Sequence, residues 1–507
     1  MTLRVETDRL RRILSASLPS GVRSAELFVE SRISLTLTMA PGSRQIGSSC
    51  LDTRIERRWE TGAHLRRFAE GRQESFILDR PTLDSLEALA LHPEAVAIKW
   101  LSGSTPLGIS PAETKGEVAP GGVPVEGESP SVEARLSDAA PSAIAGPWSE
   151  SFLASAYDLI LGWHTDLDRE AASRRADGIA CSSSVGLEAS LQEILVISTD
   201  RDPARDTRSF ADATLSLRLS RSGRSLRSEE RLSGARLEDL SRSPGSGSDD
   251  PRPPSALFSR ACMALEAVAS PQGEMPVVFA SPSGGFLMHE ICGHLLEADH
   301  VLRRDSPFVG ARGRAISSPL LTMADDGSLR GMRGSMLFDD EGVAARRTPL
   351  IMEGTLVGYL SDRVTAFATA GISTGNGRRQ SYRDAPMPRM TNLVIDPGSE
   401  TPEEIVRRTP SGLLVRRVGR GRVEPGTGRF ALAIEEGYLI EGGAVGAPVA
   451  GGVLRGDAAG LLMAIDAVGA DSIADTGAPL CLKEDQALPF GILQPTLRVA
   501  SMTVARQ

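Results

Sequence analysis

The sequence predicts an α+β protein in which an N-terminal region of mixed α/β character precedes a C-terminal domain built on an antiparallel sheet or barrel. Three observations carry this prediction. Apolar residues alternate with period two in stretches along the whole chain, which is typical of half-buried strands. Helical spacing marks a smaller number of segments between them. Two stretches rich in Pro, Gly and Ser divide the 507 residues, a length sufficient for two or three domains.

Residues 1–102 form the first predicted domain, an α+β unit. Its opening residues, "MTLRVETDRLRRILSASL", indicate a capped amphipathic helix, and "AELFVES" and "ISLTLTM" indicate adjacent strands. A second helix is predicted at "TLDSLEALAL". Residues 103–147 follow as a linker or mobile insertion, because their Pro, Gly and Ser content, with few large apolar groups, cannot offset the entropy of ordering.

Residues 148–240 are expected to form a middle α+β region that packs with the N-terminal domain. A helix is predicted from "SESFLASAYDLILGWH" onward, and strands at "LQEILVIST" and "ATLSLRLSR". The stretch 241–254 is a second predicted linker.

Residues 255–507 are dominated by strand patterns and form the C-terminal domain. A helix at "ALFSRACMALEAVAS" and a strand at "EMPVVFA" lead into a glycine-rich turn. Glu353-Gly354 indicates the turn of a hairpin. Thr401 as N-cap, Pro402 as first helical residue and Glu404 as reciprocal partner predict a short helix. Further strands are expected at "RFALAIEEGYLIEGGAVGAPV" and "PTLRVASMTV".

Composition narrows the class of protein. The formal net charge of −9 gives no reason to expect a nucleic-acid partner. The N-terminus lacks a secretory pattern, and no apolar run approaches the length of a membrane span. The five cysteines are scattered, which fits free thiols in a reducing compartment. We therefore expect a cytoplasmic protein without nucleic-acid or membrane partners.

Three of the six histidines lie in "GGFLMHEICGHLLEADH", at positions 289, 294 and 300. The spacing of five between His289 and His294 exceeds the four of the familiar zinc-protease signature. Five residues of a regular helix rotate by about 140°, so the two imidazoles would diverge. A π-turn would bring them onto one face, and Gly293 would ease that distortion. The segment therefore predicts a helix that is locally widened or broken so that both rings can reach one metal ion, with Glu290 suited to general-base catalysis. A merely structural pair of histidines is the alternative.

Two histidines do not complete a catalytic zinc site, which usually has three protein ligands. Cys292 is interpreted as a core residue, and Glu297 and Asp299 as partners that hold the imidazole N–H groups. His300 could be a ligand, but the end of the helix favours a solvated side chain. The remaining candidate is the remote Cys481, which the spacing alone does not select.

The motifs of the C-terminal half resemble those of a known family. "HEICGHLLEAD" looks like the HExxxH core of the TldD/PmbA metalloproteases, and the likeness covers roughly residues 275–500 closely. It continues in order through the segments "GSMLFDDEG", "GYLSD", "TGNGRRQSYRDAPMPRMTN", "EEGYLIEGG" and "GILQPTLRV". The chain resembles the active TldD type rather than the PmbA (TldE) type, which lacks the metal motif.

The resemblance implies one Zn²⁺ per active subunit, with His289, His294 and Cys481 as ligands and Glu290 as the catalytic carboxylate. It implies hydrolysis of unfolded peptides in the cytoplasm, by a homodimer or by a heterodimer with a PmbA/TldE-like subunit. The N-terminal region, the 103–147 insertion and the bulky residues around Cys481 depart from the family pattern, which bears on partner choice and cleft shape.

The mechanistic hypothesis is a metal-activated water whose proton passes to Glu290 and then to the leaving amine. Arg378, Arg379 and Tyr382 are candidate substrate-binding or oxyanion donors. They could equally belong to a structural loop held by Asp339 or Asp340. Two other functions stay open: a non-catalytic peptide-binding subunit of a TldD/TldE-like complex, and a metal-dependent hydrolase of a different substrate class.

Overall fold

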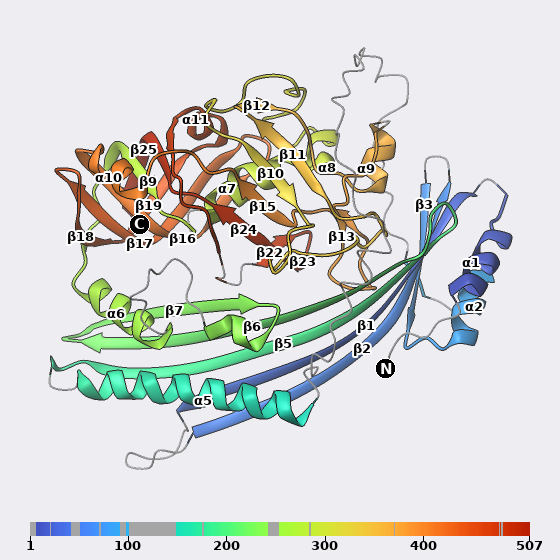
Figure 1. Ribbon diagram of the computed structural model, residues 1–507, viewed down its shortest axis with the longest axis horizontal. Helices are drawn as coiled ribbons and strands as arrows, with labels where there is room; N and C mark the ends of the chain where they lie inside the picture. Colours follow the sequence, from blue (N-terminus) through green and yellow to red (C-terminus); the bar gives the residue numbers. More distant parts are fainter. Residues whose placement is uncertain are drawn as a thin grey trace.

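A long, curved antiparallel sheet forms the lower layer of the computed structural model, and the strand-rich C-terminal half lies on one of its faces (Figure 1). The described residues are 7–20, 22–41, 51–69, 72–91, 98–100, 149–174, 177–241, 253–282, 285–369, 371–475, 477 and 480–506. The predicted linker 103–147, and residues 242–252 of the predicted linker 241–254, lie outside them.

The lower sheet has the strand order β4-β3-β2-β1-β5-β6-β7, so it joins strands from before and after residues 103–147. Its strands are β1 Val22–Pro41, β2 Leu51–Ala69, β3 Arg72–Asp79, β4 Ile98–Trp100, β5 Ala180–Ser198, β6 Ala204–Arg221 and β7 Arg224–Gly234.

The prediction of two adjacent strands at "AELFVES" and "ISLTLTM" is wrong, because both stretches belong to the single strand β1. The alternation keeps its phase across the junction at Arg32: Leu27, Val29, Leu35 and Leu37 are all fully buried odd positions. With no turn residue between the stretches, one continuous strand satisfies every backbone group.

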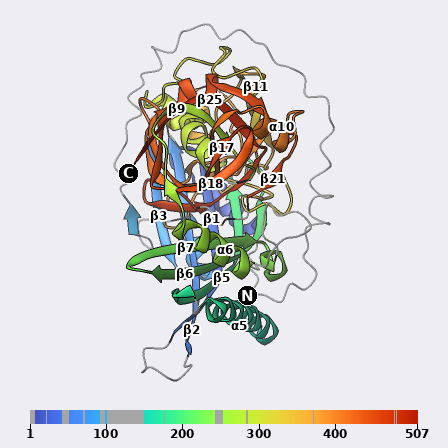
Figure 2. The same cartoon turned by 90° about the vertical axis from the view of Figure 1, so that its left-hand side faces the viewer.

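Helices cover the face of the sheet opposite the C-terminal half (Figures 1 and 2). The predicted helices α1 Thr7–Ala16 and α2 Leu83–Leu91 pack on Leu27 and Leu65 at one end. The predicted α5 Glu150–Ser173 covers Leu35 on that face. The helix α6 Pro253–Leu265 belongs to the same hydrophobic cluster but lies beside β7, between the sheet and the C-terminal half (Figure 1). The 3-10 turn η2 spans Leu237–Ser241. No described helix is long and apolar enough to cross a lipid bilayer.

Five strands of the C-terminal half close a barrel in the order β16-β9-β25-β19-β17, with β17 returning to β16. All its pairings are antiparallel except that of β16 with β9, so the predicted antiparallel barrel is confirmed with one parallel pair. This sheet comprises β8 Val268–Ala269, β9 Gly273–Phe279, β16 Ser411–Glu424, β17 Arg429–Glu441, β18 Ala444–Ala450, β19 Gly452–Asp457, β20 Ile465–Val468 and β25 Leu497–Arg506.

A six-stranded sheet lies beside the barrel, in the order β12-β11-β10-β15-β24-β21. Its strands are β10 Met323–Asp326, β11 Arg347–Met352, β12 Thr355–Leu356, β15 Asn392–Ile395, β21 Ile473–Ala474 and β24 Gly491–Gln494. The predicted hairpin turn is confirmed: Glu353 and Gly354 both have positive φ, 43° and 81°, and join β11 to β12.

Short elements complete this half. The helices are α7 Gly285–Met288, α8 Ala298–Leu302, α9 Arg363–Ala368, α10 Pro402–Arg407 and α11 Ala458–Met463. Two small hairpins pair β13 Gly377–Arg378 with β14 Met387–Pro388, and β22 Leu480–Lys483 with β23 Gln486–Pro489. The capping box of α10, with Thr401 and Glu404 bonding reciprocally, is as predicted.

Candidate metal centre

The histidine segment contains the predicted π-turn. After α7, residues His289–Gly293 form a π-helical turn, and the His294 N–H donates to the His289 carbonyl five residues back. A 3-10 turn, η4 His294–Leu296, follows. The widened turn places the two imidazoles on one side, with ring centroids 4.8 Å apart and planes at 76°. The prediction of a locally widened helix is confirmed.

Gly293 has a different role from the one predicted. Its φ of −54° is ordinary helical geometry, so its backbone freedom is not used. A Cβ atom at this position would lie 2.0 Å from the sulfur of Met390, whose side chain packs directly on the turn. Glycine is therefore required for close packing against Met390 rather than for backbone distortion.

Cys481 lies on the small β22–β23 hairpin, which brings its side chain to the two histidines. Glu484 and Asp485 form its two-residue turn, both with positive φ. Because side chains alternate along a strand, Cys481 and Lys483 point into the protein, while Leu480 and Leu482 are 52% and 73% exposed. The hairpin therefore presents a buried sulfur to a helix 187 residues earlier in the chain.

The three donor groups converge. The Cys481 Sγ lies 3.1 Å from the His294 Nε2, and one ligand atom from each of His289, His294 and Cys481 lies within 4.8 Å of the others. His289 and Cys481 are buried, at 0% and 3% exposed. Two imidazoles and a thiolate are a donor set that suits zinc.

Charge at the site favours a cation. Burial raises the pKa of the Cys481 thiol, but His294 and His289 outweigh burial and hold that pKa well below its ordinary value. Burial lowers the pKa of His294, whereas Cys481 and Glu297 raise it, with a net result well above the ordinary value. The thiolate and carboxylate therefore stabilise positive charge between them, which is what a divalent ion would supply.

His289 supports the same assignment. Both of its ring nitrogens are buried, and neither has a hydrogen-bond partner among the described residues. The ring stacks on Phe490 at 3.7 Å between centroids and on Phe286 at 6.3 Å. Stacking thus orients the ring while a nitrogen stays available to an ion, and a metal bond would remove the cost of one unsatisfied buried nitrogen.

Glu297 holds the second imidazole, as predicted, and the structure adds a lysine behind it. Glu297 Oε2 lies 3.0 Å from His294 Nδ1 and 2.8 Å from Lys483 Nζ. Burial raises the pKa of Glu297, but Lys483 and His294 overcome burial and hold it far below its ordinary value. The carboxylate is therefore an acceptor for the Nδ1–H of His294.

The structure corrects two expectations about the residues that follow Glu297, namely the partner of Asp299 and the exposure of His300. Asp299 accepts from Lys483 Nζ and from Arg303, both at 2.8 Å, so the prediction for its partner is wrong. The interpretation of His300 as solvated is also wrong: its side chain is 12% exposed and lies 3.4 Å from Asp305. Cys292 is fully buried in the core, as predicted.

Arg378 and Arg379 are held by the protein itself. Arg378 donates to the carbonyls of Met390 and Pro489 at 2.6 and 2.8 Å. The backbone N–H of Arg379 donates to Asp340 at 2.8 Å, and its guanidinium bonds the Asp340 carbonyl. Both side chains are 2% exposed. These contacts favour the structural interpretation of this loop over an oxyanion role, because terminal guanidinium nitrogens of both arginines already donate within the protein, although the Nε of each has no partner among the described residues.

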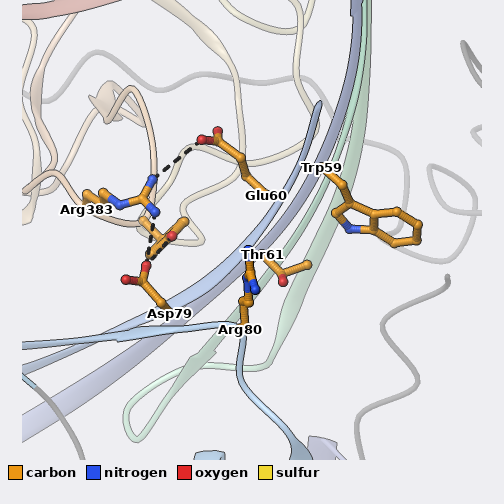
Figure 3. A pocket seen from close by; sticks show the side chains of 7 residues that line it. Trp59, Glu60, Thr61, Asp79, Arg80 and Arg383 are labelled. Atoms are coloured by element: carbon orange, nitrogen blue, oxygen red, sulfur yellow. Dashed lines mark hydrogen bonds and ion pairs between the residues drawn. The ribbon is translucent and has the colours of Figure 1, made fainter. Parts of the chain in front are cut away.

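Tyr382 is likewise engaged away from the imidazoles. Its ring packs on Gly62 of β2, where a Cβ would lie 2.0 Å from the ring, and its hydroxyl donates to Asp79. It lines a pocket of about 420 Å³ in which Arg383 bridges Glu60 and Asp79 (Figure 3). The seven residues that line this pocket include none of the three candidate metal donors.

Sequence reasoning missed Lys483, Arg389 and Phe490. Arg389 is fully buried and donates to the backbone carbonyls of Cys481 and Gln486, which fastens the hairpin. The signal for Lys483 was present in the sequence: it is one of only three lysines among 56 basic residues, and it lies two positions from Cys481 on a strand. Phe490 and Arg389 carry no such signal, because their roles arise from tertiary contacts.

Residues 272–506 match the family described as PmbA/TldA metallopeptidase C-terminal domain. The metalloprotease TldD homolog of Haemophilus influenzae is 35% identical over 343 residues, which are 67% of this chain and 70% of the relative. The zinc metalloprotease TldD homolog of Saccharolobus solfataricus is 30% identical over 234 residues, 46% and 52% of the two chains.

The solved structure of TldE from Thermococcus kodakarensis has the same fold. Its TM-score is 0.67 with 17% identity, over 98% of this chain and 99% of that chain. This likeness and the sheet topology confirm the predicted α+β fold. The relatives' names describe metal-dependent proteases. The HExxxH turn, the match over the C-terminal half and the identity to the Haemophilus protein agree, and the chain therefore belongs to the TldD/PmbA family of metallopeptidases.

Proposed function

We propose that this chain is a zinc-dependent peptidase that hydrolyses peptide bonds of unfolded or extended polypeptides, with one Zn²⁺ per active subunit. His289, His294 and Cys481 would be the ligands and Glu290 the general base. The observation that carries the proposal is the convergence of two imidazoles and one sulfur within 4.8 Å, beside a glutamate in the same π-turn.

The donor set suits the chemistry. His289, His294 and Cys481 would hold the ion, and zinc bound there would supply Lewis acidity that makes water a better nucleophile near neutral pH. The buried surroundings strengthen this electrostatic effect, because Cys481 belongs to the hydrophobic core of the C-terminal half and the buried His289 stacks on Phe490 of that core. The curated relative named as a zinc metalloprotease supports the choice of zinc.

Glu290 is the proposed proton carrier. It follows His289 directly in the π-turn, and it is partly exposed, whereas its neighbours His289 and Ile291 are fully buried. A carboxylate there would take a proton from the attacking water at a side-chain oxygen and return it to the nitrogen of the leaving amine. Glu297 would hold His294 through its Nδ1, which leaves Nε2 as the nitrogen that binds the ion.

An extended substrate suits the hairpin that carries Cys481. Among the described strands β22 pairs only with β23, so its outer edge offers backbone groups to a polypeptide added as a further strand. Strand addition reads the backbone and requires an unfolded segment. The proposed assembly is a homodimer or a heterodimer with a PmbA/TldE-like subunit, and light scattering on the purified chain, alone and mixed with such a subunit, tests it.

Metal analysis tests the ligand set. We expect about one zinc per chain in the purified protein, and loss of zinc in His294→Ala and in Cys481→Ala. Cys262→Ala is the matched control, since Cys262 is a free thiol on α6 away from the donors and should leave the zinc content unchanged. Full zinc retention in Cys481→Ala would contradict the proposed ligand set.

Hydrolysis of denatured casein tests the activity. Glu290→Gln should keep its zinc and lose about 10²- to 10⁴-fold in kcat/KM, the usual contribution of a general base. Unchanged hydrolysis by Glu290→Gln would refute the assignment of the base. If the unaltered zinc-loaded chain binds casein without cleaving it, alone and with a PmbA/TldE-like partner, the chain is instead a non-catalytic binding subunit.

A further inference from the structure

Lys483 makes three contacts with its ammonium group from a position that is 8% exposed. Nζ lies 2.8 Å from Glu297 Oε2, 2.8 Å from Asp299 Oδ1 and 3.1 Å from the Pro388 carbonyl. An ammonium has three N–H donors, so each finds an acceptor. Lys483 is therefore a fully committed internal cation rather than a surface charge.

The residue type is informative in this chain. Lysine occurs at only three positions, 99, 115 and 483, against a large excess of arginine. A compact ammonium can donate in three directions to acceptors from three segments, whereas a planar guanidinium fork cannot occupy the same point. The geometry around Nζ thus calls for lysine at a place where this chain almost always uses arginine.

Glu297 links Lys483 to the candidate ligand His294. The same oxygen, Oε2, receives both Lys483 Nζ and the Nδ1 of His294. Glu297 is fully buried, and a buried carboxylate without a counter-charge costs several kcal/mol. With the ammonium beside it, Glu297 stays an acceptor. Glu297 would then hold the imidazole by its Nδ1 and direct the Nε2, which lies 3.1 Å from the Cys481 sulfur, toward the place of a shared metal ion.

The strand that carries Lys483 also carries Cys481. The two residues lie on the same face of β22 because side chains alternate. Fastening the ammonium to Glu297 therefore sets the position of the sulfur relative to the imidazole. One ion pair connects both halves of the centre, the histidine turn and the hairpin.

We propose that Lys483 is a positioning residue of the metal centre, which orients His294 through Glu297 and places Cys481 through β22. The inference rests on the ligand set of the proposed function and adds to it. It predicts that metal affinity depends on a lysine that does not touch the metal.

Cobalt binding to the full-length metal-free chain tests this inference. The thiolate-to-cobalt absorption band reports the Cys481 bond, and competition with a chelator gives the dissociation constant. Lys483→Met should bind Co²⁺ about 10- to 100-fold more weakly, the range typical when a partner behind a ligand is lost. Leu482→Ala is the matched control, because Leu482 is the neighbouring, outward-facing residue of β22. The Co²⁺ affinity of this variant should stay within about 2-fold of that of the unaltered chain.

A double-mutant cycle distinguishes positioning from a general loss of structure. If Lys483 acts through Glu297, then Lys483→Met made in a Glu297→Gln background should weaken binding by much less than in the unaltered chain. An equal loss in both backgrounds would overturn the relay through Glu297. Affinity of Lys483→Met within 2-fold of the unaltered chain would overturn the inference entirely.

Lys483→Arg covers the case in which the methionine variant does not fold. It retains the positive charge and moves the donors, so it should fold and still lose affinity several-fold, with a shifted cobalt band. Affinity and spectrum equal to the unaltered chain would refute the geometric argument. If the unaltered chain itself binds Co²⁺ without a thiolate band, the proposed ligand set fails instead, which separates the two outcomes.

Discussion

A buried cluster of charges joins the long sheet to the C-terminal half, and its centre is Glu26 of β1. The Glu26 carboxylate meets three guanidiniums: Arg66 at 2.7 Å, Arg363 at 3.2 Å and Arg379 at 3.3 Å. Arg66 belongs to β2, whereas Arg363 begins α9 and Arg379 directly follows β13. Glu341 takes a second bond from Arg66 at 2.7 Å.

Replacement of this carboxylate should measurably destabilise the protein. Burial raises the pKa of Glu26, but Arg66, Arg379 and Arg363 outweigh burial and lower it from 4.5 to about 2. At about 1.4 kcal/mol for each pKa unit, the ionised form stabilises the fold by about 3 kcal/mol relative to the protonated form. We expect Glu26→Gln to lower the free energy of unfolding by about 3 kcal/mol at pH 7, which agrees with the roughly 3–5 kcal/mol lost when one partner of a buried ion pair is removed.

The pH dependence follows from the sign of the shift. Because the pKa of Glu26 is lower in the folded chain, its contribution is complete above about pH 4.5 and is lost as the pH falls toward 2. Urea unfolding of the unaltered chain and of Glu26→Gln, followed by tryptophan fluorescence at pH 7 and pH 3, measures this contribution. The difference in the free energy of unfolding between the two proteins should be smaller at pH 3. Glu56→Gln is the control, since Glu56 pairs with Arg54 on the exposed part of β2 and should change stability by about 0–1 kcal/mol. A loss below about 1 kcal/mol in Glu26→Gln at pH 7, or an equal loss at both pH values, would refute this reasoning.

Three further predictions concern single side chains. Burial raises the pKa of Asp325 from 3.8 to about 6, against the opposing hydrogen bonds of Thr391, so the stability of the protein should fall by about 3 kcal/mol as the pH rises across that window. Asp325→Asn should flatten this part of the curve of thermal midpoint against pH, and an unchanged slope would contradict the assignment. Gly293→Ala should cost about 1–3 kcal/mol in urea unfolding because its Cβ would strike Met390, and Met390→Ala in the same chain should recover part of the loss; no recovery would mean that another contact is responsible. Phe490→Leu removes the ring stacked on His289 and should weaken Co²⁺ binding by about 0.5–1.5 kcal/mol in chelator competition, so unchanged affinity would show that stacking does not orient the imidazole.

Local patterns in the sequence were sufficient where local physics decides the structure. The spacing of five between His289 and His294 predicted a π-turn, because only a widened turn can bring both rings onto one face. The capping residues Thr401 and Glu404 predicted α10, and the dipeptide at 353–354 predicted a hairpin turn. The period-two alternation predicted strands but not their extent, since β1 continues through a junction that looked like a boundary.

The sequence by itself determined the two histidines, their widened turn and the adjacent Glu290, because backbone hydrogen bonds and residue spacing act over a few positions. The tertiary structure alone decided which side chains from other segments lie beside these residues. The approach of Cys481 across 187 residues depends on a hairpin fastened by Arg389 and Lys483. Of the two interpretations that the sequence left open for Arg378 and Arg379, their burial against backbone carbonyls and carboxylates favours the structural loop. Such contacts depend on how separate segments pack, and packing is set by the whole chain at once rather than by any local pattern.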